Sequence, residues 1–197
     1  HDAASALAYS SEADVESLRS AGYKVDLGRG WGDTDSASPP TFRQAEVRGA
    51  DGSVKIDWAV DAAFRFFPIE ENPFLGWRLH QFDAATNKAL ALSGRTETRD
   101  YIDIVELDAQ YPLEAICWAA CGKDEGFSPL SLLTMMRRFA KVSPTQLEVI
   151  QARNLDPIEL KQRWIEMSVR ADEQITALAD RLPDTPRFFY IRGSASP

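Results

Sequence analysis

A lysine, two arginines and two aspartates occur close together between positions 88 and 103, and their types suit phosphate chemistry. Lys88 carries a compact positive charge of the kind that binds a polyphosphate. Asp100 and Asp103 are carboxylates, which bind hard cations or remove a proton from a hydroxyl group. Arg95 and Arg99 lie between the lysine and the aspartates in the sequence. The five residues together are candidates for a phosphate site.

Two predicted helices position these side chains. Ala85, Lys88, Ala89 and Leu92 recur at three- and four-residue spacing, which predicts a helix that ends at Gly94. A second helix is predicted to begin near Thr98, which would be its N-cap, so that Asp100 and Asp103 share one face of its first turn. A short helical hairpin would then bring these acids back towards Lys88.

The segment resembles the K-x-x-A-L-x-x-R-x-x-x-R-D-x-x-D-L signature of the AbiEii/AbiGii toxin group, bacterial nucleotidyltransferases of abortive-infection and toxin–antitoxin systems. The matching residues are Lys88, Ala91, Leu92, Arg95, Arg99, Asp100 and Asp103, with Ile104 in place of the final leucine. The resemblance covers roughly residues 50 to 110 well and the rest of the chain loosely. The alternative is an ordinary amphipathic helix pair with a surface ion-pair network.

The resemblance implies transfer of a nucleoside monophosphate from a nucleoside triphosphate to an acceptor, which is a tRNA, a protein hydroxyl or a small molecule, with Mg²⁺ as cofactor and a cognate antitoxin as a partner. Lys88, Asp100 and Asp103 would be catalytic, and Lys88, Arg95 and Arg99 would bind the nucleotide. Nucleotidyltransferases take a third metal-binding carboxylate from a strand, and Asp57 in Lys-Ile-Asp-Trp matches that place. A solvent-facing strand aspartate is the alternative for Asp57.

The sequence also departs from this family. Such enzymes begin with a Gly-Gly/Ser-Thr segment, which is followed by a strand with an Asp-x-Asp pattern that binds the metal. Neither pattern occurs before Lys88. Asp33 and Asp35 lie in a Gly/Ser/Pro-rich loop that predicts a turn. The expected Asp-x-Asp strand would lie upstream of His1, and without it we expect no metal-dependent transfer. The second hypothesis is a catalytically inactive scaffold of the same fold that binds a nucleotide or a protein, and the third is a helical adaptor.

Periodicity elsewhere predicts an α+β protein, with a nucleotidyltransferase-like mixed β-sheet and flanking helices followed by a C-terminal helical bundle. Period two at 41–48 and 54–61, with Gly49 to Gly52 between them, predicts a β-hairpin that follows a helix over 12–21 and a strand over 23–27. Helices are predicted over 112–120, over 129–140 with Ser128 as cap, and from Pro144 and Pro157 onward. The predicted divisions are an α/β lobe over 1–80, a helical lobe over 81–182 and a tail over 183–197.

Composition restricts the remaining possibilities. The 197 residues include 22 Lys+Arg and 30 Asp+Glu, a formal net charge of −8, which gives no general basis for nucleic-acid binding. Cys117 and Cys121 lack further Cys or His partners nearby and are predicted to be buried, inert thiols. The sequence predicts no membrane-spanning segment and no signal peptide, which favours a cytoplasmic protein.

Overall fold

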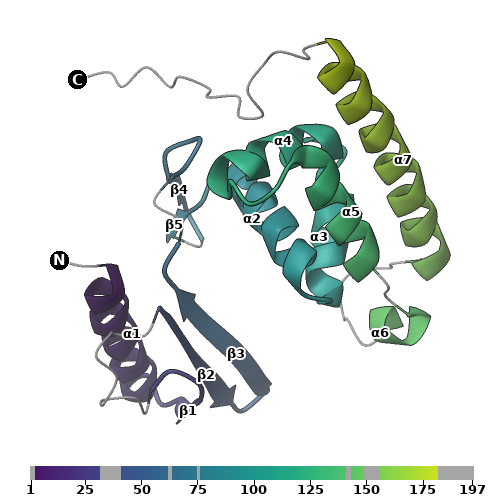
Figure 1. Cartoon of the computed structure of the whole chain (residues 1–197). Coiled ribbons are helices and arrows are strands. Elements are labelled where there is room, and N and C mark those ends of the chain that lie inside the picture. The colour runs from purple at the N-terminus through teal and green to yellow at the C-terminus, as the bar shows by residue number, and fades with distance from the viewer. Residues whose placement is uncertain are drawn as a thin grey trace, which may run out of the picture. The chain divides into compact units, whose positions relative to one another are not determined.

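The computed structural model describes residues 3–31, 41–61, 64–74, 76–140, 143–148 and 156–181. Small antiparallel sheets come first and a mostly helical region follows, so the predicted α+β class is confirmed (Figure 1). The elements in order are α1 (Ala3–Ser20), β1 (Lys24–Leu27), β2 (Phe42–Gly49), β3 (Gly52–Ala59), β4 (Glu70–Asn72), β5 (Gly76–Arg78), α2 (Gln81–Gly94), α3 (Thr98–Leu107), α4 (Leu113–Lys123), α5 (Pro129–Phe139), α6 (Pro144–Glu148) and α7 (Pro157–Arg181).

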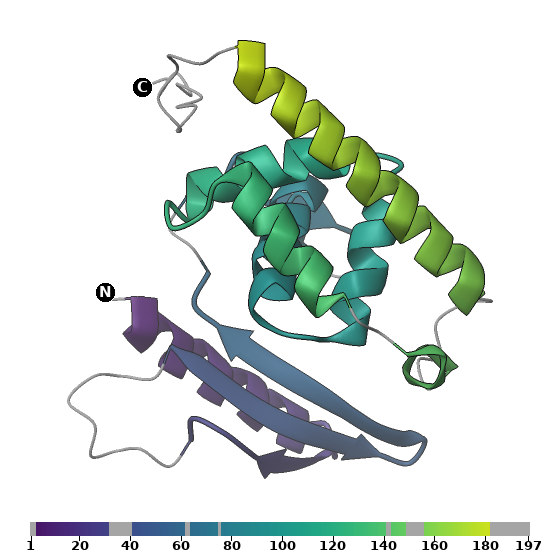
Figure 2. The same ribbon diagram turned by 45° about the vertical axis from the view of Figure 1, so that its right-hand side comes forward.

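The chain forms two compact units, His1–Ala63 and Phe64–Pro197. In the first unit β2 and β3 form the predicted hairpin, and β1 pairs with β2 to make a three-stranded antiparallel sheet. Helix α1 lies along one face of this sheet, as Figure 2 shows. Alternation places Ala45 and Val47 of β2 on the covered face, where they pack with Val15 of α1.

The second unit has a larger core, which lies between α2, α3, α4, α5 and α7. The predicted apolar face of α2 is buried, with Ala85, Ala89 and Leu92 fully inside. Tyr101 of α3 is also buried, its hydroxyl donates to the carbonyl of Leu160 in α7 at 3.3 Å, and burial raises the pKa of this phenol to about 12. Cys117 and Cys121 are buried in this core, as predicted.

Several predicted boundaries differ from the structure. Helix α1 begins at Ala3 rather than at residue 12. The prediction that Thr98 caps α3 is wrong, because Glu97 is the N-cap residue, forms no side-chain cap and leaves Thr98 as the first helical residue. The prediction that Ser128 caps α5 is confirmed by a reciprocal capping box with Ser131. The predicted tail over 183–197, and the loop that contains Asp33 and Asp35, lie outside the described residues.

The sequence predicts a boundary between the lobes after residue 80, whereas the chain divides into its two compact units after residue 63. The segment from Phe64 onward belongs with the helices because the Asp83 carboxylate of α2 accepts hydrogen bonds from the backbone N–H groups of Phe66 and Phe67, both at 3.0 Å. The same segment holds the short β4–β5 hairpin. Phe64 and Phe67 in this segment are 47% and 44% exposed. Among the helices that the structure describes, none is long and apolar enough to cross a membrane.

Candidate functional site

The α2–α3 hairpin brings four of the predicted site residues together. The Lys88 ammonium lies 2.9 Å from Asp100 Oδ1 and 2.8 Å from Asp103 Oδ2. Arg95, the residue that follows α2, contacts Asp100 Oδ2 through Nε at 2.9 Å and through Nη2 at 2.8 Å. Lys88 is two helical turns into α2 from Gln81, and the aspartates lie within the first six residues of α3. The predicted convergence of the lysine with both acids is confirmed.

Asp100 is at the centre of this network and its side chain is completely buried. An isolated buried carboxylate would cost several kcal/mol of desolvation, which the two cations on its two oxygens offset. The first turn of a helix also favours a negative charge, because the N-terminal N–H groups carry partial positive charge. Asp100 therefore holds Lys88 and Arg95 in fixed positions beside the start of α3.

Asp103 differs from Asp100 in exposure, because its side chain is 45% exposed. The ion pair that it forms with Lys88 is consequently a half-solvated one, which contributes little to stability and opens easily. Burial by itself would lower the pKa of Lys88, but the contacts with Asp103 and Asp100 outweigh it and hold this pKa above its ordinary value. Lys88 is therefore a permanent cation at neutral pH.

The positive side chains of the cluster reach solvent. The side chains of Lys88 and Arg95 are 33% and 52% exposed, and Arg99 is exposed in the first turn of α3. A guanidinium and an ammonium side by side suit an anion with several oxygens, since the guanidinium offers paired donors and the ammonium a point charge. The geometry thus suits an anion such as a phosphate at the outer side of the network.

The carboxylates fit a magnesium ion poorly. Asp100 and Asp103 both direct an oxygen at Lys88 Nζ, so the ammonium fills the position between them that a metal ion would take. Within the described ranges, no group of three or more His, Cys, Asp or Glu residues could hold a metal. Asp57, the predicted metal ligand, lies on β3 in the other unit, where its Oδ1 accepts a hydrogen bond from Gln44 Nε2 at 2.8 Å.

A second ion pair, between Asp83 and Lys123, was not predicted. Lys123 Nζ lies 2.8 Å from Asp83 Oδ1, and the two side chains are 1% and 0% exposed. The ammonium also donates to Asn87 Oδ1 at 2.9 Å. Burial alone would raise the pKa of Asp83, but Lys123 and the N–H groups of Phe66 and Phe67 outweigh it and lower this pKa.

The signal for this pair in the sequence was weak. Asp83 lies in the first turn of α2 and Lys123 in the last turn of α4, the positions where helices favour an acid and a base respectively. Such residues are normally solvated, and no local pattern indicates that two of them meet across 40 positions. The pair became visible only when α2 and α4 were packed together.

Comparison with known proteins adds no relative to this picture. No protein-family model matches the chain, and neither a curated protein nor a solved structure does.

Proposed function

We propose that this chain is a nucleotidyltransferase-like protein that binds the triphosphate of a nucleoside triphosphate at Lys88, Arg95 and Arg99. The observation that carries the proposal is the buried Asp100 carboxylate, which holds Lys88 and Arg95 through contacts of 2.8 to 2.9 Å. A buried acid that positions two partly exposed cations is an arrangement that orients donors before a ligand arrives. The signature shared with the AbiEii/AbiGii toxin group supplies the chemical class of that ligand.

In this proposal Asp100 positions the cations and Asp103 competes with the ligand. Asp103 is half exposed and contacts the same ammonium that would bind phosphate, so its carboxylate swings into solvent when the triphosphate arrives. Arg99 extends the cationic surface along α3. Mg²⁺ supplied with the nucleotide would neutralise phosphate charge. Transfer of the nucleoside monophosphate to a tRNA or protein acceptor is the reaction that follows from the resemblance.

Titration with each nucleoside triphosphate and with inorganic triphosphate, in the presence and absence of MgCl₂, tests the binding step. Arg95→Gln should weaken binding by about tenfold, the usual effect of one charge-assisted hydrogen bond. Arg48→Gln is the matched control, because Arg48 is 51% exposed, forms ion pairs with Asp26 and Glu46, and lies in the other unit. Equal effects of the two substitutions, or no binding of any triphosphate, would refute the proposal.

The variant Asp103→Asn distinguishes two roles for Asp103, that of a competitor of the triphosphate for the Lys88 ammonium and that of a catalytic group. Loss of a carboxylate that occupies the Lys88 ammonium should tighten triphosphate binding several-fold, because one competing negative charge is gone. Where the unaltered protein transfers label from an α-labelled triphosphate to tRNA or to protein, the same transfer should then be measured on this variant. Tighter binding with transfer intact makes Asp103 a competitor only, and tighter binding with transfer lost makes it catalytic. Weaker binding contradicts the competition.

A protein-binding scaffold is the second candidate, and the β4–β5 hairpin favours it. Phe74 is 94% exposed and Trp77 is 67% exposed, and Ile69 before β4 is 44% exposed. Neighbouring large apolar side chains in water are typical of surfaces that bind another protein. In this second candidate function, Lys88 and Arg95 serve only to hold α2 against α3. Substitutions of these two residues would then change the free energy of unfolding without changing the affinity for any nucleotide.

A further inference from the structure

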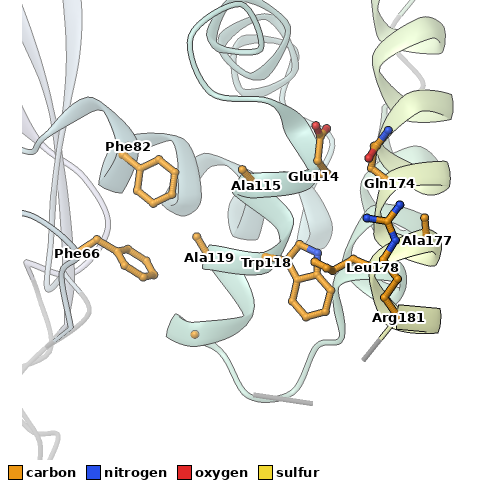
Figure 3. A pocket seen from close by; sticks show the side chains of 11 residues that line it. Phe66, Phe82, Glu114, Ala115, Trp118, Ala119, Gln174, Ala177, Leu178 and Arg181 are labelled. Atoms are coloured by element: carbon orange, nitrogen blue, oxygen red, sulfur yellow. The ribbon is translucent and has the colours of Figure 1, made fainter. Parts of the chain in front are cut away.

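A cavity of about 530 Å³ lies on the surface of α4 and is bordered by α7. Figure 3 shows Phe66 and Phe82 on one side of it, Ala115 and Ala119 in the middle, and Leu178 and Arg181 of α7 on the other side. The lining is mostly apolar, and the volume lies within the range of pockets that hold drug-sized groups. No residue of the candidate phosphate site lines it.

One wall of this cavity is held rigidly. The backbone N–H of Phe66 donates to the buried Asp83 carboxylate, which the Lys123 ammonium neutralises. The rings of Phe66 and Phe82 meet edge to face with centroids 5.4 Å apart. A preorganised apolar wall loses little conformational freedom when a ligand binds, which favours occupation of the cavity.

The chain itself continues from the edge of this cavity. Arg181, the last residue of α7, belongs to the lining, and the sequence then runs through Leu182 to an apolar run at 188–191, Phe-Phe-Tyr-Ile. Six residues lie between Arg181 and Phe188, so Phe188 is at most about 25 Å from Arg181 in an extended chain. A segment tied to the rim of a pocket has an effective concentration of the order of millimolar there, so even weak docking is populated.

The run also carries hydrogen-bond donors for an unsatisfied acceptor in the lining of the cavity. Glu114 lines the cavity, and its Oε2 atom is buried with no hydrogen-bond donor among the described residues, 3.7 Å from Arg170 Nε. The apolar run is flanked by Arg187 and Arg192. An arginine beside docked aromatic rings would place a guanidinium near this carboxylate and complete its hydrogen bonding.

We propose that residues 188–191 of this chain dock into the α4–α7 cavity, with their aromatic side chains against Phe66, Phe82 and Trp118. The burial of aromatic surface on docking is the main driving force. The cavity is then an intramolecular receptor for the C-terminal segment, independent of nucleotide binding at Lys88.

Disulfide trapping in the full chain tests the docking directly. Ala115 is exposed and lines the cavity, so Ala115→Cys combined with Ile191→Cys should form an intramolecular disulfide under mild oxidation. The control pair is Ile165→Cys with Ile191→Cys, since Ile165 is 59% exposed on α7 and does not line the cavity. Native Cys117 and Cys121 are buried, and burial raises the pKa of both thiols, so they stay unreactive. The expected result is trapping at least tenfold faster for the first pair.

Trypsin cleavage after Arg187 and Arg192 gives a second readout. Docking should protect both bonds, and the triple variant Phe188→Ala, Phe189→Ala and Tyr190→Ala should be cleaved several-fold faster and bind more of an apolar dye. Phe74→Ala is the matched control, because it removes an aromatic ring that is 94% exposed and outside the cavity. Equal trapping rates for the two cysteine pairs, disulfides between two chains, or unchanged cleavage of the triple variant would overturn the proposal.

Discussion

At the residue scale, Asp100 and Asp103 contact the same ammonium but differ in burial, and this difference predicts different energetic roles. Asp100→Asn leaves two cations beside a neutral buried group and should lower the free energy of unfolding by about 3 to 5 kcal/mol. Asp103→Asn removes a half-exposed ion pair and should cost at most about 1 kcal/mol. Urea unfolding of both variants measures the difference. Equal losses of unfolding free energy in the two variants would mean that the exposure of the two carboxylates does not determine how much each contributes to stability.

The buried Asp83–Lys123 pair makes stability depend on pH in the acid range. The pKa of Asp83 is lowered by folding, from an unfolded value of about 3.9, so its contribution is complete above that value and is lost as pH falls through the folded pKa. Asp83→Asn should therefore reduce the loss of unfolding free energy as the pH falls below about 4. Asp51→Asn, at an exposed turn position, is the control and should leave the pH profile unchanged. Identical profiles for the three proteins would contradict this assignment.

At the scale of single elements, the capping box at the start of α5 predicts a coupled pair of serines. The Ser131 N–H donates to Ser128 Oγ, and the Ser128 N–H donates to Ser131 Oγ at 2.8 Å. Ser128→Ala should lower the free energy of unfolding by about 1 kcal/mol, because an N-terminal N–H of the helix loses its acceptor. Ser131→Ala should cost less once Ser128 is already alanine, since both residues belong to one interaction. Additive losses in a double-mutant cycle would show that the box does not act as a unit.

At the scale of the whole molecule, each unit has a core of its own, which predicts separate responses to core substitutions. Val15 is 4% exposed in the first unit and Leu133 is 1% exposed in the second. Val15→Ala should speed amide hydrogen exchange in β1, β2 and β3 and leave α4 and α5 unchanged, whereas Leu133→Ala should do the reverse. The losses should be roughly 2 kcal/mol and 2 to 5 kcal/mol respectively. Faster exchange throughout the chain in either variant would show that the units unfold together.

Much of this protein was predictable from local patterns, because the spacing of apolar residues and the turn residues act over short stretches of chain. The β2–β3 hairpin around Gly49 and Gly52, the apolar face of α2 and the Ser128 cap were all predicted in this way. The meeting of Lys88 with Asp100 and Asp103 was predictable too, since a short helical hairpin joins residues that are near in sequence.

Only the tertiary structure decided which of these charged groups are buried and what their distant partners are. Periodicity places Asp100 and Asp103 on one face of α3, yet the packing of α3 against α2 buries one and leaves the other half exposed. Lys123 forms an ion pair with Asp83 because α4 packs on α2. The Asp83 carboxylate also accepts a hydrogen bond from the backbone N–H of Phe66, which attaches the segment from Phe64 onward to the helices. Burial and partner choice depend on contacts between elements far apart in sequence, and local spacing carries no information about them.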